Sequence, residues 1–178
     1  MGYHHLALAC RDIQAVHHFY EDIMGFELVK VEIGPVPEGG WAKHFFYRME
    51  DNQKFIAFWE LHDVPGTENL ETNISRAAGV PDQINHVAFD VADMAALQSR
   101  KSKSLNAGLE ELEIDHTWCH SIYTRDPNGI LVEFCVTTGS FNAADRQAAL
   151  TALTAEDPEF SPPPASIEFI KPPGPAAR

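Results

Sequence analysis

The sequence predicts an α+β protein that is built from two copies of one small pattern. Each copy opens with a histidine, His5 or His86, which an aspartate follows at the same distance, Asp12 or Asp93. After each histidine, apolar residues alternate as they do in a half-buried strand, so that the histidine points away from the buried face. Each aspartate stands where a helix N-cap belongs. Each half therefore opens with a strand and continues into a helix.

Both halves then continue with two strands that meet at a turn. The expected helices contain Val16, Phe19, Tyr20 and Ile23 in the first half, and Met94, Leu97 and Leu105 in the second. The expected strands cover residues 45–47 and 55–61 around a turn at Asp51-Asn52, and residues 122–124 and 130–136 around a turn at 126–129. Turn-forming Asp, Asn, Pro and Gly residues between apolar runs favour this interpretation.

One domain is expected over residues 1–140, with a first module at about 3–64 and a second at about 84–138. A chain of 178 residues is long enough for two fused modules that share a core. Residues 141–178 are expected to be an appendage to this domain.

Within the appendage, Asn142 is predicted to cap a helix from residue 143 to about 153. Seven of the twelve prolines follow Asp157, and such a tail cannot form a core of its own. Its apolar segment 167–170 is predicted to lie against the body or a partner subunit, with a disordered end as the alternative.

Composition excludes several classes of partner. A formal net charge of −13 argues against nucleic acid, and the one basic run, residues 100–103, is expected to form the solvated face of a helix. No apolar stretch approaches the roughly 18 residues of a membrane span. The first residues lack a secretory signal pattern, so a cytosolic location is expected. The three cysteines share no metal-binding spacing and are predicted to be buried, reduced thiols.

A glutamate lies in the last strand of each half, Glu60 in the first and Glu133 in the second. A carboxylate in an apolar strand is costly to bury without a partner. Taken alone, a strand glutamate or histidine is more often on a solvated or hydrogen-bonded face. Together with His5 and His86, however, the two glutamates form a ligand set that divalent metals accept, and we predict a metal site made of these four residues.

The paired motifs resemble those of the vicinal-oxygen-chelate superfamily. They are the two His-to-Asp motifs, Phe19-Tyr20, Gly25-Phe26 and the closing segment 126–133. The superfamily includes glyoxalase I, methylmalonyl-CoA epimerase, extradiol dioxygenases and bleomycin-resistance proteins. The resemblance covers residues 3 to 138 and implies two βαβββ modules that form a cup-shaped mixed sheet. It also implies a homodimer, because related chains complete or support their cups across subunits.

The four predicted ligands follow one another along the chain in the same order of residue types as in glyoxalase I: His5, Glu60, His86 and Glu133. They imply one divalent ion, which can be Fe, Ni, Zn, Co or Mn, with two open positions for neighbouring oxygens of a small-molecule substrate. The first expectation is therefore isomerase, epimerase or lyase chemistry through an enolate, in which Glu60 or Glu133 moves a proton.

The first alternative is extradiol cleavage of a catechol on Fe(II). His116, Tyr123 and Glu133 match the ring-cleavage signature, in which the corresponding His and Tyr contact the catecholate. Against this alternative, Glu60 would fill a metal position that catechol and O₂ need. In addition, Lys54 stands where those enzymes have a catalytic histidine; His44 and His62 are the nearby substitutes.

The second alternative is a protein that binds a ligand without catalysis, as the bleomycin-binding relatives do. Those relatives generally lack the set of four metal ligands, which makes this alternative the weaker one. Trp41, Trp118, Arg125 and Tyr123 are candidates to line the substrate pocket. His116 and Tyr123 either take part in catalysis or only line the cup.

Overall fold

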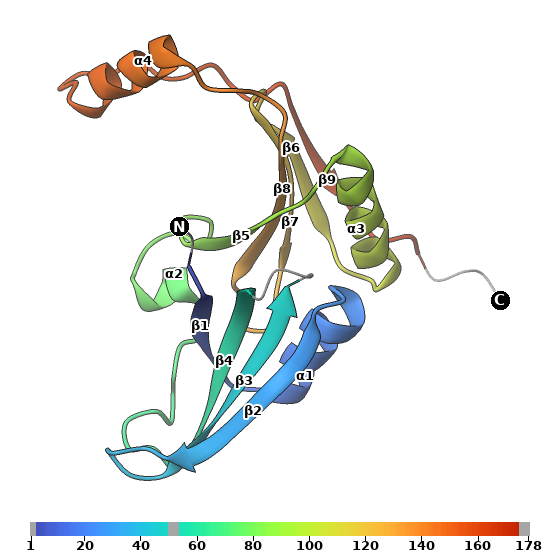
Figure 1. The fold of residues 1–178 in the computed structure, drawn as a ribbon, viewed down its shortest axis with the longest axis vertical. Helices are drawn as coiled ribbons and strands as arrows, with labels where there is room; N and C mark the ends of the chain where they lie inside the picture. Colours follow the sequence, from blue (N-terminus) through green and yellow to red (C-terminus); the bar gives the residue numbers. More distant parts are fainter. Residues whose placement is uncertain (1–2, 50–53, 175–178) are drawn as a thin grey trace.

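The computed structural model describes residues 3–49 and 54–174, which form two mixed sheets and several helices (Figure 1). The first sheet has the order β1-β4-β3-β2, from β1 (His5–Cys10), β2 (Glu27–Pro35), β3 (Trp41–Met49) and β4 (Lys54–His62). The second has the order β5-β8-β7-β6-β9, from β5 (His86–Asp90), β6 (Glu111–Asp115), β7 (Cys119–Arg125), β8 (Leu131–Thr137) and β9 (Ser166–Ile170). The helices are α1 (Ile13–His17), its π-helical continuation η1 (His18–Ile23), α2 (Ile74–Ala77), α3 (Met94–Asn106) and α4 (Ala143–Leu153).

The two halves repeat one topology, which confirms the predicted fold class. β1 runs parallel to β4 and β5 runs parallel to β8, while the other paired strands are antiparallel. The predicted strands are present. Three are longer than expected, because pairing continues beyond the apolar runs, and the one predicted at 130–136 is shifted by one residue to Leu131–Thr137. The expected turn at Asp51-Asn52 lies outside the described residues.

The predicted helix caps are confirmed. Asp12 accepts a hydrogen bond from the backbone N–H of Ala15 (3.0 Å), and Asp93 accepts one from Ala96 (2.8 Å). Asn142 forms a capping box at the start of α4 with Asp145. These side chains satisfy backbone donors that the first helical turn leaves without partners.

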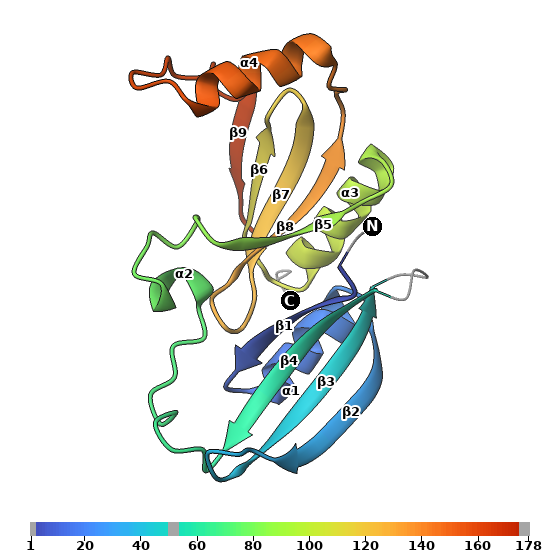
Figure 2. The same cartoon turned by 60° about the vertical axis from the view of Figure 1, so that its left-hand side comes forward.

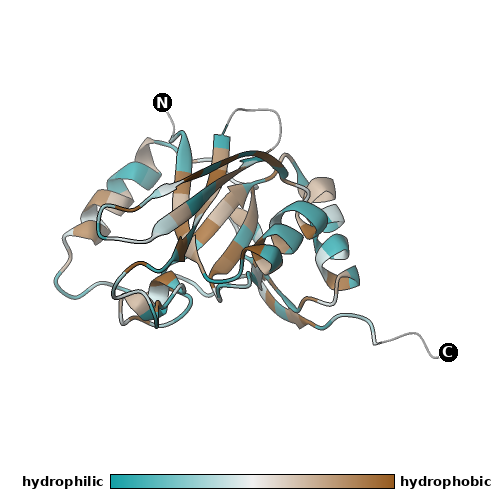
Figure 3. Ribbon diagram, turned by 90° about the horizontal axis from the view of Figure 1, so that it is seen from below, coloured by the Kyte–Doolittle hydropathy of each residue, from teal (hydrophilic) through white to brown (hydrophobic). Residues whose placement is uncertain are grey.

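The two halves share one hydrophobic core, which lies on the helix-covered faces of both sheets. Tyr20 of η1 is fully buried and its hydroxyl donates to Asp126 of the second half (3.1 Å). The rings of Phe26 and Phe89 meet edge to face with centroids 5.1 Å apart. Figure 3 shows apolar residues gathered on the central strands. The opposite face of each sheet is therefore turned away from the shared core, and we call it the open face.

The prediction for residues 100–103 is wrong for two of the basic residues. Arg100 donates to the carbonyl of Met24 (2.9 Å) and lies over the ring of Phe134, so it joins the two halves. Lys101 donates to the buried Glu113 (2.7 Å). Long basic side chains can bury their aliphatic stems when the charged group reaches a partner, and a charge count does not reveal this.

The C-terminal segment contributes one strand and one projecting helix (Figures 1 and 2). β9 pairs antiparallel with β6, which confirms that the segment 167–170 lies against the body. All residues of α4 are exposed. Within residues 3–49 and 54–174, no helix is both long and apolar enough to cross a membrane.

A buried glutamate makes the stability of the fold depend on pH. Glu111 of β6 is 3% exposed, and burial raises its pKa from 4.5 to about 7. In the unfolded chain the carboxyl ionises near its ordinary pKa, whereas in the folded protein it keeps its proton up to about pH 7. Stability from this group is therefore present below pH 4.5 and is lost as the pH rises to 7.

We expect Glu111→Gln to raise the free energy of unfolding at pH 8 by roughly 3 kcal/mol and to change it little at pH 4. Urea unfolding of both proteins at the two pH values measures the difference. An equal effect at pH 4 and pH 8 would contradict the proposed ionisation.

Candidate functional site

His86 and Glu133 lie side by side on the open face of the second sheet. In the parallel pair β5–β8, His86 is in register with Leu131, and Ala88 with Glu133. Nε2 of His86 lies 3.1 Å from Oε2 of Glu133, and Glu133 is 6% exposed. The strand pairing thus brings two predicted metal ligands into contact.

Hydrogen bonds orient both groups. Ser121 donates its hydroxyl proton to Oε1 of Glu133 (2.6 Å), and Nδ1 of His86 lies 3.3 Å from the carbonyl oxygen of Ile84. A carbonyl can only accept, so in this contact Nδ1 is the donor. In the neutral imidazole with that tautomer, Nε2 is left as an acceptor that can bind a metal ion beside Glu133.

Two acceptor atoms at that separation are stabilised by a cation or a shared proton between them. Ligand bonds near 2.1 Å put atoms at adjacent positions of an octahedral ion about 3 Å apart. The donor types and the spacing of His86 and Glu133 therefore fit a divalent transition-metal ion, as does the carbonyl partner that fixes the histidine tautomer.

A histidine and a tyrosine lie next to this pair on the same face. Tyr123 of β7 is in register with Glu133. Its hydroxyl lies 3.0 Å from Nε2 of His116, in the turn between β6 and β7, and its ring centroid lies 6.4 Å from that of His86. Burial, with a further contribution from the Glu133 carboxylate, raises the pKa of Tyr123, so its phenol stays protonated at neutral pH. We take His86, His116, Tyr123 and Glu133 as the candidate site.

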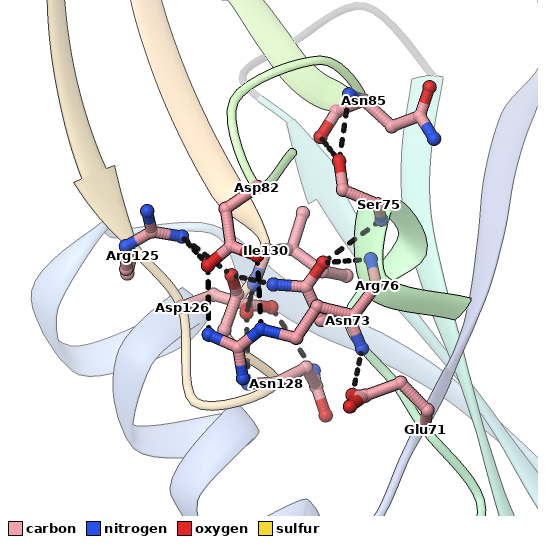
Figure 4. Close-up of polar contacts among 11 residues, drawn as sticks. Glu71, Asn73, Ser75, Arg76, Asp82, Asn85, Arg125, Asp126, Asn128 and Ile130 are labelled. Carbon is pink, nitrogen blue, oxygen red and sulfur yellow. Dashed lines mark hydrogen bonds and ion pairs between the residues drawn. The ribbon is translucent and has the colours of Figure 1, made fainter. Parts of the chain in front are cut away.

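Besides His116 and Tyr123, one predicted pocket residue of this half borders the site. Arg125 ends β7 on the open face, where its guanidinium donates to the carbonyl of Gly129 (3.1 Å) and lies 3.4 Å from Asp82 (Figure 4). Trp118 lies at the opposite end of that strand, where its ring contacts Phe141 (5.4 Å between centroids).

A buried polar cluster holds the β7–β8 hairpin that carries Tyr123 and Glu133 (Figure 4). Asp126 accepts hydrogen bonds from the backbone N–H groups of Asn128 and Ile130, each at 2.9 Å. Asn73 caps α2 and donates to the carbonyl of Gly129 (2.6 Å). The link between the modules is thus tied to the hairpin by directional bonds.

His5 lies on the open face of the other sheet. It is in register with Phe55 of β4, and its ring centroid lies 5.5 Å from that of Phe46 and 6.3 Å from that of His44. Among residues 3–49 and 54–174 of one chain, no three or more His, Cys, Asp or Glu side chains come together to hold a metal. Within one chain the structure does not bring His5 to His86 and Glu133.

Glu60 lies on the opposite face of its sheet from His5. It is in register with Cys10, and its carboxylate accepts from Lys43 Nζ (3.0 Å) and lies 2.8 Å from His62 Nε2. Burial acts to raise the pKa of Glu60, but the hydrogen bonds from Lys43 and His62 outweigh it and lower the pKa. Trp41 stacks on His62 with centroids 3.8 Å apart, so this predicted pocket residue belongs to the Glu60 cluster.

Strand register explains the placement of Glu60. Ala7 pairs with Ala57 in the first half as Ala88 pairs with Glu133 in the second, so Ala57 is the counterpart of Glu133. Glu60 is an odd number of residues from Ala57, which turns its side chain to the other face. Its parity with the apolar Ile56 and Phe58 was the sequence signal for this placement. Ser121 lies two residues before Tyr123 in the same strand, so strand alternation would have placed it on the same face as a site residue.

Comparisons with known proteins place the fold. The sequence profile of the Glyoxalase/Bleomycin resistance protein/Dioxygenase superfamily matches residues 2–134. A glyoxylase/bleomycin resistance protein/dioxygenase domain from Frankia sp. EAN1pec is similar in structure, with a TM-score of 0.61 and 18% identity over 79% of this chain and 95% of that chain. No curated protein sequence matches significantly.

Two further solved structures are similar in fold. The fosfomycin resistance protein FosX from Listeria monocytogenes gives a TM-score of 0.53 and 18% identity over 82% of this chain and 98% of its own. TnmS3, an antibiotic-binding protein from Streptomyces sp. CB03234, gives a TM-score of 0.55 and 11% identity over 78% of this chain and 97% of its own. At sequence identities this low, the structural similarity shows the fold alone.

We expect Asn73→Ala to lower the free energy of unfolding by about 2 kcal/mol, because it removes a buried helix cap and the bond to Gly129. The matched control is Asn142→Ala, which removes the same kind of cap from the exposed helix α4 and should change global unfolding by less than about 0.5 kcal/mol. Urea denaturation of the two variants checks this; equal losses would show that Asn73 contributes no more than an ordinary cap.

Proposed function

The chain belongs to the Glyoxalase/Bleomycin resistance protein/Dioxygenase superfamily, and we propose that it is a metal-dependent enzyme whose ion is bound by His86 and Glu133. The observation that carries this proposal is the contact of 3.1 Å between Nε2 of His86 and Oε2 of Glu133, with each group oriented by a hydrogen bond to another residue. The substrate proposed is a small molecule with two neighbouring oxygens.

The third ligand proposed is His5 from a second copy of the chain. His5 is exposed on its open face. Among the described strands, β1 and β5 each have a neighbour on one side only, so each leaves a row of backbone groups available for pairing. A two-fold symmetric homodimer that places β1 of one copy beside β5 of the other would create two equivalent sites.

Two histidines and one carboxylate leave three positions open on an octahedral ion, which is typical of non-haem iron(II) oxygenases. Glu60 would fill one of those positions if it were a fourth ligand. With Ala57 as the counterpart of Glu133 and Glu60 bonded to Lys43 and His62, the geometry favours the three-ligand set. We therefore favour extradiol cleavage of a catechol over the enolate chemistry that the sequence favoured first.

The protein groups have separate tasks in this chemistry. A bound iron(II) ion supplies a Lewis acid for two substrate oxygens and a position for O₂. His116 accepts the proton that a catechol hydroxyl loses, and the protonated Tyr123 donates a hydrogen bond to the resulting oxyanion. Ser121 keeps the Glu133 carboxylate turned toward His86. Lys54 remains at the position where extradiol enzymes carry a further histidine.

Proton transfer through an enolate is the second candidate function. In this alternative Glu133 moves the proton, which its position beside His86 and the hydrogen bond from Ser121 support. Glu60 has no part in it, since its carboxylate is held by Lys43 and His62.

We expect anaerobically purified protein to contain a divalent metal, and iron-loaded protein to consume O₂ with catechols. His86→Ala and Glu133→Gln should each weaken metal binding on the order of 100-fold, because each removes a ligand. Glu60→Gln is the control carboxylate and should leave metal binding unchanged. Metal analysis, metal titration and O₂ uptake measure these outcomes.

A protein that binds metal and consumes no O₂, but exchanges deuterium into α-hydroxyketones, would support the enolate alternative and contradict ring cleavage. Loss of metal in Glu60→Gln would restore the four-ligand set. A protein that binds no divalent ion would contradict the proposed function.

Mixing inactive variants tests the shared site. His5→Ala and His86→Ala proteins should each lack metal, but after joint unfolding and refolding, half of the dimers are mixed and each has one intact site. We expect about a quarter of the wild-type metal content to return. No recovery would mean that His5 and His86 act within one chain, whereas metal retained by His5→Ala alone would mean that His5 is not a ligand.

A further inference from the structure

The C-terminal strand adds an apolar edge to the second sheet, outside the part of the chain that the superfamily profile matches. The match ends at residue 134, whereas β9 covers Ser166–Ile170. In its antiparallel pairing with β6, Phe169 is in register with Leu112, and Ile167 with Ile114. Phe169 is 82% exposed and Ile167 is 55% exposed. Because these two large apolar side chains stay in water, they contribute little hydrophobic stabilisation to the pairing of β9.

Register places Phe169 on the same face as the candidate site. Glu133 pairs with Tyr123, Tyr123 with Leu112, and Leu112 with Phe169, so one row of side chains crosses the open face from β8 to β9. Neighbouring strands lie about 4.8 Å apart, which puts Phe169 about 10 Å across the sheet from Tyr123. Glu168 points to the opposite face.

A hollow of about 410 Å³ joins these residues. Its lining is largely apolar and consists of Leu112, Tyr123, Arg125, Leu131 and Phe169, together with residues 108–111 and Thr124 at the ends of β6 and β7. Tyr123 belongs to both this hollow and the candidate site, and Leu131 is in register with His86. Exposed apolar side chains around a hollow on a small protein often mark a place where a ligand binds.

We propose that β9 forms the far wall of the substrate pocket and that Phe169 selects substrates with a flat apolar substituent. The inference rests on the proposed function, because it takes the two substrate oxygens to be held beside His86 and Glu133. From there the substituent extends past Tyr123 and over Leu112 to the Phe169 ring. Phe169 contacts the substituent and lies too far from the oxygens to take part in the chemistry.

The test compares catechol with 4-phenylcatechol. A second pair, phenol and 4-phenylphenol, lacks the second oxygen. Dissociation constants are measured by calorimetry on zinc-loaded, full-length wild type, Phe169→Ala and Glu168→Ala. We expect wild type to bind each phenyl compound at least tenfold more tightly than its parent. Phe169→Ala should reduce this preference to about twofold while the Kd of catechol stays the same. Glu168→Ala, on the same strand, should match wild type.

The inference is overturned if Phe169→Ala keeps the phenyl preference, if wild type has none, or if the variant changes the sedimentation coefficient, which would make β9 a subunit contact. Failure of the proposed function gives another result. Catechol would then bind no more tightly than phenol. The preference for the phenyl compounds, and its loss in Phe169→Ala, would remain. Phe169 is exposed, so the variant is expected to unfold at the wild-type temperature, and thermal unfolding checks this.

Discussion

The parallel pairing of β5 with β8 is the interaction on which the candidate site depends. It sets His86 beside Glu133, and the antiparallel pairing of β7 with β8 then adds Tyr123 and Ser121 on the same face. A slip of one residue between β5 and β8 would turn His86 to the other face, and a slip between β7 and β8 would turn Tyr123 and Ser121. The buried side chains of Val132 and Phe134 oppose such a slip, because they would have to leave the core.

Sequence alone predicted most of this half. The repeated His-to-Asp motif, the caps at Asp12 and Asp93 and the alternation around Glu133 all depend on local rules, and the structure agrees with them. Local rules do not give the register between strands that are far apart in the chain. The pairing of His5 with Phe55 is such a quantity. The burial of Glu60 was a local one, because its parity with Ile56 and Phe58 already placed it on the buried side.

The contacts of Arg100 with Met24 and Phe134 escaped the sequence for a related reason. The pattern of a single helix shows which of its faces is apolar, but it does not show which backbone carbonyl of the other module a long basic side chain will reach. The link from Asn73 to Gly129 is equally non-local. The sequence therefore predicted the modules better than the contacts between them.

The two open faces have different chemical characters. That of the second sheet carries the hydrogen-bonded groups of the candidate site. That of the first carries rings: His44 stacks on Trp59 with centroids 3.7 Å apart and lies 4.2 Å from Phe46. His44 is buried, its Nε2 has no hydrogen-bond partner among the described residues, and burial, together with His5, lowers its pKa.

A neutral imidazole in an aromatic surface suits contact with a flat substrate better than ion pairing. If the two faces meet in a homodimer, the second module supplies two metal ligands and the proton-handling groups, whereas the first supplies His5 and an aromatic surface. The apolar edge at β9 then lies on the side of the second sheet away from β5. Chelation at one end of the pocket and apolar contact at the other would together fix the orientation of a bound ring.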